Sequence, residues 1–148
     1  MATAKTKPTI DTIAGECIAV RLRMLNRGVT NIYDEALRPL DLKVSQMNIL
    51  VVAARLGTAS PGAVGRILHL DASTLSRNLE RMRRRGWLEA IEDASDARLQ
   101  PFRVTAAGLT LLERAYPSWR EAQVRASNLL GENGPEALAE APGAVLSR

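Results

Sequence analysis

The chain has 148 residues, a length that suits one compact domain with its own hydrophobic core. Aromatic residues make up only 3% of it, which argues against a protein that stacks single-stranded bases on aromatic rings. The formal net charge of +4 favours a polyanionic partner, and the single cysteine, Cys17, excludes an internal disulfide and fits a reducing compartment.

The first element that the sequence predicts is a long amphipathic helix over residues 11–38. Apolar side chains recur there at alternating steps of four and three residues, which is the period of an α-helix. Pro39 ends the pattern. Residues 1–9 hold two lysines with no apolar stretch after them, so we expect a frayed tail and not a signal peptide. No apolar run approaches the ~20 residues that a membrane helix needs, and we expect a cytoplasmic protein.

Three shorter helices are predicted next. The second helix spans residues 45–56, with Ser45 as its N-cap. The third starts at Ser60-Pro61, because serine is a favoured cap and proline suits the first helical position. The fourth follows a tight turn, with Asp71 as its cap, and ends before Gly86.

A β-hairpin is predicted after the fourth helix. Residues 87–91 and 99–104 have the pattern of two short strands, and a polar, turn-rich tip lies between them. Pro101 limits the second strand to an edge position, because proline has no N–H to donate.

The chain is predicted to end with two more helices. Thr105 caps the fifth, which Pro117 is expected to kink or break. A short last helix starts at Pro135, and Pro142-Gly143 is expected to end it. The predicted fold class is therefore mainly α with a small β-hairpin wing.

The fourth helix concentrates the positive charge: five arginines and one acidic residue lie between residues 72 and 86. On a helical wheel Leu75, Leu79 and Met82 share one face, which leaves a polar face free. Arginine can donate two parallel hydrogen bonds to guanine, and serine or threonine can bond bases or phosphates. The candidate DNA-contacting residues on this helix are Ser73, Thr74, Ser76, Arg77, Arg81 and Arg84.

The alternative for this helix is a solvated basic face. Two helices joined by a tight turn and followed by a hairpin favour instead a winged helix-turn-helix, whose second helix enters the major groove of double-stranded DNA. Exposed Arg98, at the wing, suits a narrow minor groove, and Asp96 could orient its guanidinium group. A polar turn with an incidental ion pair is the alternative for these two residues.

The recognition helix and wing resemble those of the MarR (multiple antibiotic resistance regulator) family. The stretch LDASTLSRNLERM, from Leu70 to Met82, continues into RGWLE at residues 85–89. The family's wing pattern is matched by Asp93, Asp96 and Arg98, followed by Val104, Thr105 and Gly108. The helix order also fits over roughly residues 11–130.

This resemblance implies a transcriptional regulator, expected to be a repressor, that binds a near-palindromic operator as a homodimer and is released by a small ligand or an oxidant. It implies a single MarR-like domain over residues 1–148, with dimerisation helices at 11–40 and 106–148 and a winged helix-turn-helix lobe at 45–104. The apolar stripes on the first and fifth helices are too long for one small domain to cover, which supports a homodimer independently. The early end expected for the last helix leaves its share of the interface open.

Two features concern control of such a regulator. Peroxide-sensing members of the family carry a reactive cysteine in the region of Cys17, and Arg21, one turn later, could stabilise a thiolate; a small buried apolar residue is the alternative that we favour. The resemblance also implies small aromatic or phenolic effectors, in a pocket that Met24, Tyr116 and Trp119 are candidates to line. Ordinary core packing is the alternative for each of these three.

An enzyme finds little support in the sequence. We expect no catalytic site and no cofactor, because there is no glycine-rich phosphate loop and no nucleophile motif. We expect no metal site either, because His69 has no second histidine and no cysteine nearby. Two other functions stay open: a winged-helix module that docks a protein partner, and a non-specific architectural DNA binder. An arginine-rich fourth helix argues against the protein-docking module.

Overall fold

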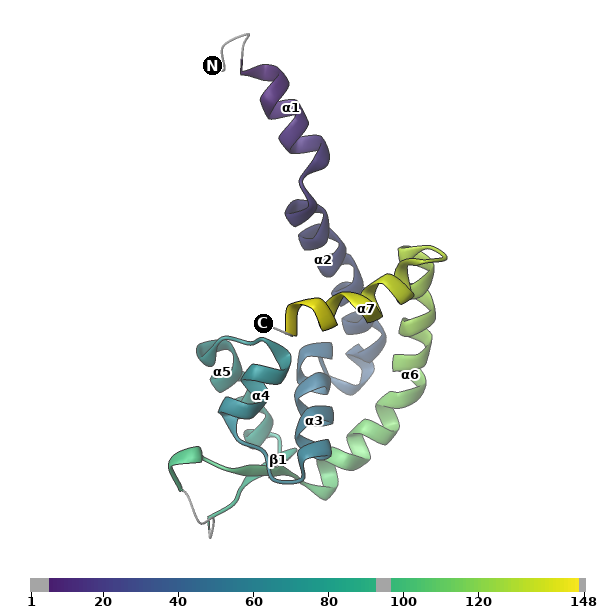
Figure 1. Ribbon diagram of the computed structural model, residues 1–148. Helices are drawn as coiled ribbons and strands as arrows, with labels where there is room; N and C mark the ends of the chain where they lie inside the picture. Colours follow the sequence, from purple (N-terminus) through teal and green to yellow (C-terminus); the bar gives the residue numbers. More distant parts are fainter. Residues whose placement is uncertain (1–5, 93–96, 147–148) are drawn as a thin grey trace.

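The structure is a computed structural model that describes residues 6–92 and 97–146. It is mainly helical with one two-stranded antiparallel hairpin, so the predicted fold class is confirmed. The elements, in chain order (Figure 1), are α1 (Lys7–Glu16), α2 (Ile18–Leu37), η1 (Arg38–Leu40), α3 (Val44–Leu56), α4 (Pro61–Leu68), α5 (Ala72–Arg84), β1 (Leu88–Ala90), η2 (Ala97–Leu99), β2 (Phe102–Val104), α6 (Ala106–Leu130) and α7 (Gly134–Leu146).

The predicted N-terminal helix is in fact two helices, and this corrects the sequence analysis. Cys17 has extended backbone angles (φ −64°, ψ 107°) and separates α1 from α2. Its N–H still bonds to the carbonyl of Ile13 at 3.1 Å, so the break lies at one residue. Figure 1 shows α1 reaching away from the rest of the structure, and none of its residues is buried. Periodicity cannot detect such a break, since the apolar pattern continues across it.

Helices α2 and α6 pack antiparallel and form the long part of the structure. Gly28 lies beside Leu129, whereas Tyr33 donates a hydrogen bond to Gln123 further along the pair. Glu35 and Arg125 form an ion pair of 3.0 Å between the same two helices. We refer to α1, α2, α6 and α7 together as the stem.

Two helices continue past prolines that were expected to kink, break or end them. Helix α6 is continuous through Pro117, and α7 continues through Pro142-Gly143 to Leu146. Packing explains the first case, because Ala115 and Ala122, on either side of Pro117, are fully buried. Tertiary contacts of this kind offset the backbone hydrogen bond that a proline cannot make.

The remaining elements, α3, α4, α5, β1 and β2, form what we call the lobe. Its core contains Ile49 and Leu50 of α3, Val64 of α4 and Phe102 of β2, all 0% exposed. Leu37, at the end of α2, is also 0% exposed and belongs to the same cluster. The stem and the lobe therefore share one core at the point where α2 ends.

Helix α3 starts earlier than predicted, and its cap differs. Lys43 and not Ser45 is the N-cap residue. Gln46 reaches back and accepts the N–H of Lys43 at 3.1 Å, while Asp34 of α2 accepts the N–H of Val44 at 2.8 Å. A glutamine three residues after the N-cap position is a capping-box pattern that can be recognised in the sequence. The contribution of Asp34 comes from a different helix, so only the tertiary structure places it.

Candidate DNA-binding interface

A tight turn joins α4 to α5. Ser60 caps α4 by accepting the N–H of Ala63 at 3.3 Å, as predicted. His69 adopts the left-handed conformation (φ 51°), and Leu70 returns its N–H to the carbonyl of Gly65 at 3.0 Å. The turn ends α4 and leads directly into α5, whose apolar face packs on the lobe core.

Asp71 caps α5, which confirms the prediction. Its carboxylate accepts the N–H of Thr74 at 2.8 Å and the hydroxyl of Ser73 at 2.7 Å. These hydrogen bonds, the one with Thr74 first, hold the pKa of Asp71 well below its usual range. The carboxylate stays ionised at the positive end of the helix dipole, where a negative charge is favoured.

Helix α5 has one buried face and one exposed face. Leu75, Leu79 and Met82 are at most 3% exposed, as the helical wheel predicted. Five of the six candidate DNA-contacting residues on this helix are exposed, and Thr74 is half-buried. Arg77 and Arg81 form no ion pair with any residue that the structure describes, whereas Arg84 pairs with Glu80 at 3.4 Å. The exposed face thus carries guanidinium groups that a phosphate or a base edge can reach.

The hairpin after α5 is shorter than predicted. Strand β1 pairs with β2 in the register Leu88–Val104, Glu89–Arg103 and Ala90–Phe102. Phe102 also exchanges two backbone hydrogen bonds with Ala59, at 2.8 and 2.9 Å, so the loop after α3 adds a third strand-like edge. Residues 97–99 form the turn η2 instead of the start of the second strand.

The structure describes only one of the two candidate DNA-contacting residues of the wing. Arg98 lies in η2 and is exposed. Asp96 falls outside the described residues. Trp87, at the root of the wing, is 9% exposed and belongs to the core.

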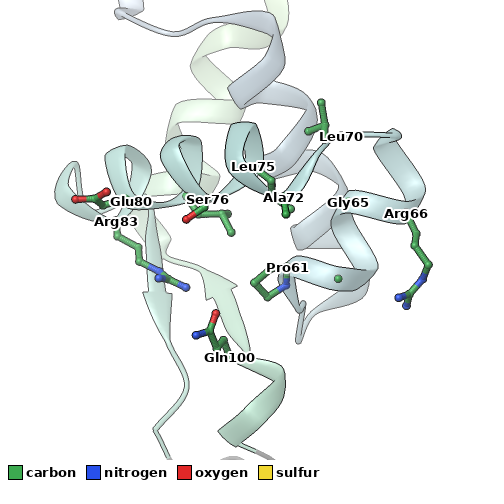
Figure 2. Close-up of a pocket in the computed structure, with 12 residues that line it drawn as sticks. Pro61, Gly65, Arg66, Leu70, Ala72, Leu75, Ser76, Glu80, Arg83 and Gln100 are labelled. Atoms are coloured by element: carbon green, nitrogen blue, oxygen red, sulfur yellow. The ribbon is translucent and has the colours of Figure 1, made fainter.

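A groove of about 690 Å³ lies between α4, α5 and the wing. Figure 2 shows Arg83 of α5 and Gln100 of the wing approaching it from one end, with Ser76 above and Pro61 opposite. The Arg83 guanidinium carbon is 5.8 Å from the centre of the Phe102 ring. Sequence reasoning did not select Arg83 or Gln100, because their shared position depends on how the wing folds back.

The structure does not bring the three candidate effector-pocket residues together within one subunit. Tyr116 and Trp119 stack, with ring centres 6.0 Å apart. Met24 is 69% exposed and lies on the far side of the contact between Gly28 and Leu129. At a rise of about 1.5 Å per residue, Met24 and Trp119 are about 20 Å apart along the helix pair. A pocket of about 430 Å³ lies instead where the stem meets the lobe, lined by Asn31, Asp34, Glu35, Arg38, Asp41, Leu42 and Lys43.

Cys17 is half-buried and lies at the break between α1 and α2. The guanidinium group of Arg21 donates to the carbonyl oxygen of Gly15. The partner that the sequence suggested for a thiolate is therefore engaged with the backbone.

Within residues 6–92 and 97–146 there is no cluster of three His, Cys, Asp or Glu side chains that could hold a metal ion. None of the helices described there has the length and apolar character to cross a membrane.

A capped helix-turn-helix with an exposed arginine-rich second helix, followed by a β-hairpin, defines the winged helix-turn-helix class. Comparisons with known proteins show which family within the winged helix-turn-helix class this chain resembles. A model of the MarR family matches residues 40–99. The chain is therefore similar to the MarR family over this region, and the predicted resemblance is confirmed. The MarR family is made of transcriptional regulators and not of enzymes, which agrees with the expectation from the sequence.

The relatives are distant in sequence. The chain is 25% identical over 95 residues to the multiple antibiotic resistance protein MarR of Escherichia coli, covering 64% of this chain and 66% of that protein. It is 26% identical over 93 residues to MarR of Salmonella typhimurium, covering 63% of this chain and 65% of that protein. The matched region thus spans about two thirds of these relatives.

Solved structures match over most of the chain. A mutant E. coli MarR complexed with operator DNA has a TM-score of 0.79 at 20% identity, covering 91% of this chain and 97% of that one. The M. tuberculosis transcriptional regulator MosR has a TM-score of 0.73 at 26% identity, covering 90% and 98%. These matches confirm the fold.

Proposed function

We propose that the protein is a sequence-specific, DNA-binding transcriptional repressor that acts as a homodimer. The observation that carries this proposal is the exposed face of α5, where Arg77 and Arg81 face solvent beside a wing. A helix in the major groove reads base edges through such side chains, while a wing contacts the flanking minor groove or backbone. The similarity to a MarR structure complexed with operator DNA supports the same partner.

The surface of the stem supports the homodimer. In the single subunit, large apolar side chains of the stem are unusually exposed for a folded protein. They include Ile10, Ile13, Ile18, Val20, Leu22, Met24, Val124, Leu129 and Leu138. A second copy that packs its own stem on this surface would bury them. It would also place two recognition helices about 34 Å apart, which suits a near-palindromic operator.

The same arrangement suggests how DNA binding could be controlled. A ligand that binds at the junction of stem and lobe needs only to change the separation of the recognition helices, to the extent that its affinity differs between the two arrangements. We propose small aromatic acids as effectors, and we rank them above oxidation of Cys17. The test is operator affinity of wild type and Cys17→Ser across a peroxide titration, repeated with salicylate-like ligands.

Each outcome of that titration is informative. If wild type and Cys17→Ser lose the operator at the same peroxide dose, Cys17 is not a sensor. If no aromatic acid changes the affinity at millimolar concentration, the proposed effector class is wrong.

Selection of binding sites from random duplexes tests the main proposal. We expect a near-palindromic motif with half-sites one DNA turn apart. If no motif is enriched and every duplex is bound tightly, the protein is an architectural DNA binder. Absence of binding to any duplex would favour a module that docks a protein. The selection is run with and without oxidant, so that a redox-dependent form of the motif is also detected.

A further inference from the structure

The last turn of α5 carries arginines that serve different parts of the molecule. Arg84 lies on the exposed face, with its side chain 72% exposed, and pairs with Glu80. Arg83 lies over the ring of Phe102 at the base of the wing. Arg85, at the C-cap, is directed to the junction between stem and lobe and contacts Asp41 there. These three arginines are consecutive in the sequence, but each contacts a different part of the molecule.

Arg85 makes three contacts at this junction. Its Nη1 donates to the backbone carbonyl oxygen of Asp41 at 2.9 Å, and its Nη2 donates to the Asp41 carboxylate. Its guanidinium carbon lies 5.0 Å from the centre of the Trp87 ring. The planar guanidinium group can make a forked hydrogen bond and stack on a ring at the same time, which lysine cannot do. The side chain is 35% exposed, so it is less open to screening by salt than that of Arg84.

Asp41 is held rigidly where the stem ends. It follows η1 directly and adopts the left-handed conformation, with φ 50° and ψ 38°. Its N–H bonds to the carbonyl of Arg38 at 2.9 Å, and its neighbour Leu42 is only 2% exposed. The carbonyl oxygen that Arg85 contacts thus belongs to a hydrogen-bonded turn that directly follows α2 and η1.

We propose that Arg85 is a positioning residue that fastens the C-terminal end of α5 to the end of the stem, and so sets the angle at which the recognition helix is presented to DNA. Through Asp41 the orientation of α5 follows that of α2. In a dimer whose stems are packed together, this link would set the separation of the two recognition helices. The inference rests on the proposed function for its consequence on DNA, but the link itself can be tested without DNA.

The first experiment measures the angle directly. Two spin labels are placed on one subunit, at Arg23→Cys on α2 and Arg81→Cys on α5, in a Cys17→Ser background diluted with unlabelled protein. We expect one narrow distance distribution with Arg85 present and a clearly broader one with Arg85→Ala. Arg84→Ala, one residue away and exposed, is the matched control and should leave the width unchanged. An unchanged width in Arg85→Ala overturns the proposal.

The second experiment measures the consequence for DNA. The affinity of the full-length protein is compared between the selected operator and the same operator with one base pair inserted between the half-sites. We expect Arg85→Ala to reduce this discrimination about fivefold, since it removes charge-assisted hydrogen bonds that hold the helix. Arg85→Lys should recover part of this discrimination, because lysine restores the positive charge but cannot make the forked hydrogen bond. Asp41→Asn, which keeps the carbonyl oxygen and tolerates the left-handed backbone, should lie between Arg85→Ala and wild type.

The control and the opposing outcomes separate the two proposals. Arg84→Ala should weaken binding to both operators by the same factor. Wild-type discrimination in Arg85→Ala, whatever its absolute affinity, contradicts the positioning role. If wild type binds no operator but Arg85→Ala still broadens the spin-label distances, the proposed function fails and the link between stem and recognition helix stands.

Discussion

Gly108 lies so close to the backbone of Trp87 that a Cβ atom at position 108 would be 2.5 Å from the Trp87 carbonyl oxygen. That carbonyl accepts the N–H of Thr105 at 3.0 Å, and the Thr105 hydroxyl donates to the carbonyl of Gly86 at 2.6 Å. The start of α6 is therefore held directly against the turn between α5 and β1. A glycine is needed here for space and not for an unusual φ angle.

Gly108→Ala should lower the free energy of unfolding by ~1–3 kcal/mol, because backbone and the Val104 side chain must move apart to admit the methyl group. Urea denaturation followed by circular dichroism measures this. Gly62→Ala in α4 is the matched control, since its Cβ would meet only the end of the Arg66 side chain at 3.6 Å. Equal stability of Gly108→Ala and wild type would show that the close contact is readily relieved.

The cap at Asp71 should give stability a specific dependence on pH. Because hydrogen bonds lower the pKa of Asp71 in the folded state, its carboxylate contributes fully above its unfolded pKa of about 3.9. The contribution is lost as pH falls through the lower, folded-state pKa. Asp71→Asn keeps an oxygen acceptor but removes the charge. The gap in melting temperature between wild type and Asp71→Asn should be constant above about pH 5 and narrow below pH ~4; a gap that does not change with pH contradicts this.

Leu22→Asp should disrupt the proposed dimer. Leu22, on α2, is 53% exposed in the single subunit, and a second stem would bury it. An unpaired carboxylate in that interface should raise the dimer dissociation constant at least about tenfold. Light scattering over a concentration series measures this. Leu99→Asp is the control, since Leu99 is 57% exposed but lies at the wing. Equal effects of the two substitutions would place the dimer interface elsewhere.

Arg77→Ala should weaken operator binding by ~1–3 kcal/mol and relax the preference at one base step, because Arg77 lies on the exposed face of α5. Binding to a set of single-base operator variants measures both effects. Arg120→Ala removes an exposed arginine of α6 and is the matched control, expected to bind like wild type. A uniform small loss on every sequence would assign Arg77 to the phosphate backbone instead.

Arg98→Ala should weaken binding most at operators whose flanking minor groove is narrow. A-tracts have the most negative minor-groove potential, which attracts an inserted arginine. Affinities for matched operators with A-tract and mixed-sequence flanks measure the preference. The same loss on both flanks would exclude a minor-groove contact for Arg98.

The sequence by itself determined the elements that depend on interactions between residues close together in the chain. Serine and aspartate caps at Ser60 and Asp71 act within three residues, and they start α4 and α5 where the pattern predicted. The buried face of α5 follows from the spacing of its apolar residues alone. Five of the six α5 residues selected from the helical wheel are accordingly exposed.

The tertiary structure decided what depends on partners far apart in the chain. Pro117 predicts a kink or a break from its local chemistry, but α6 is continuous through it, with Ala115 and Ala122 buried on either side. Met24 and Trp119 lie about 20 Å apart along the helix pair, because the register of α2 against α6 is set by contacts that no local pattern encodes. Arg85 looks like any other arginine of its run, and only its contacts with Asp41, 44 residues away, and with the Trp87 ring distinguish it. Periodicity and capping record which face of a helix is buried, whereas the neighbour that buries it is set by packing of the whole chain.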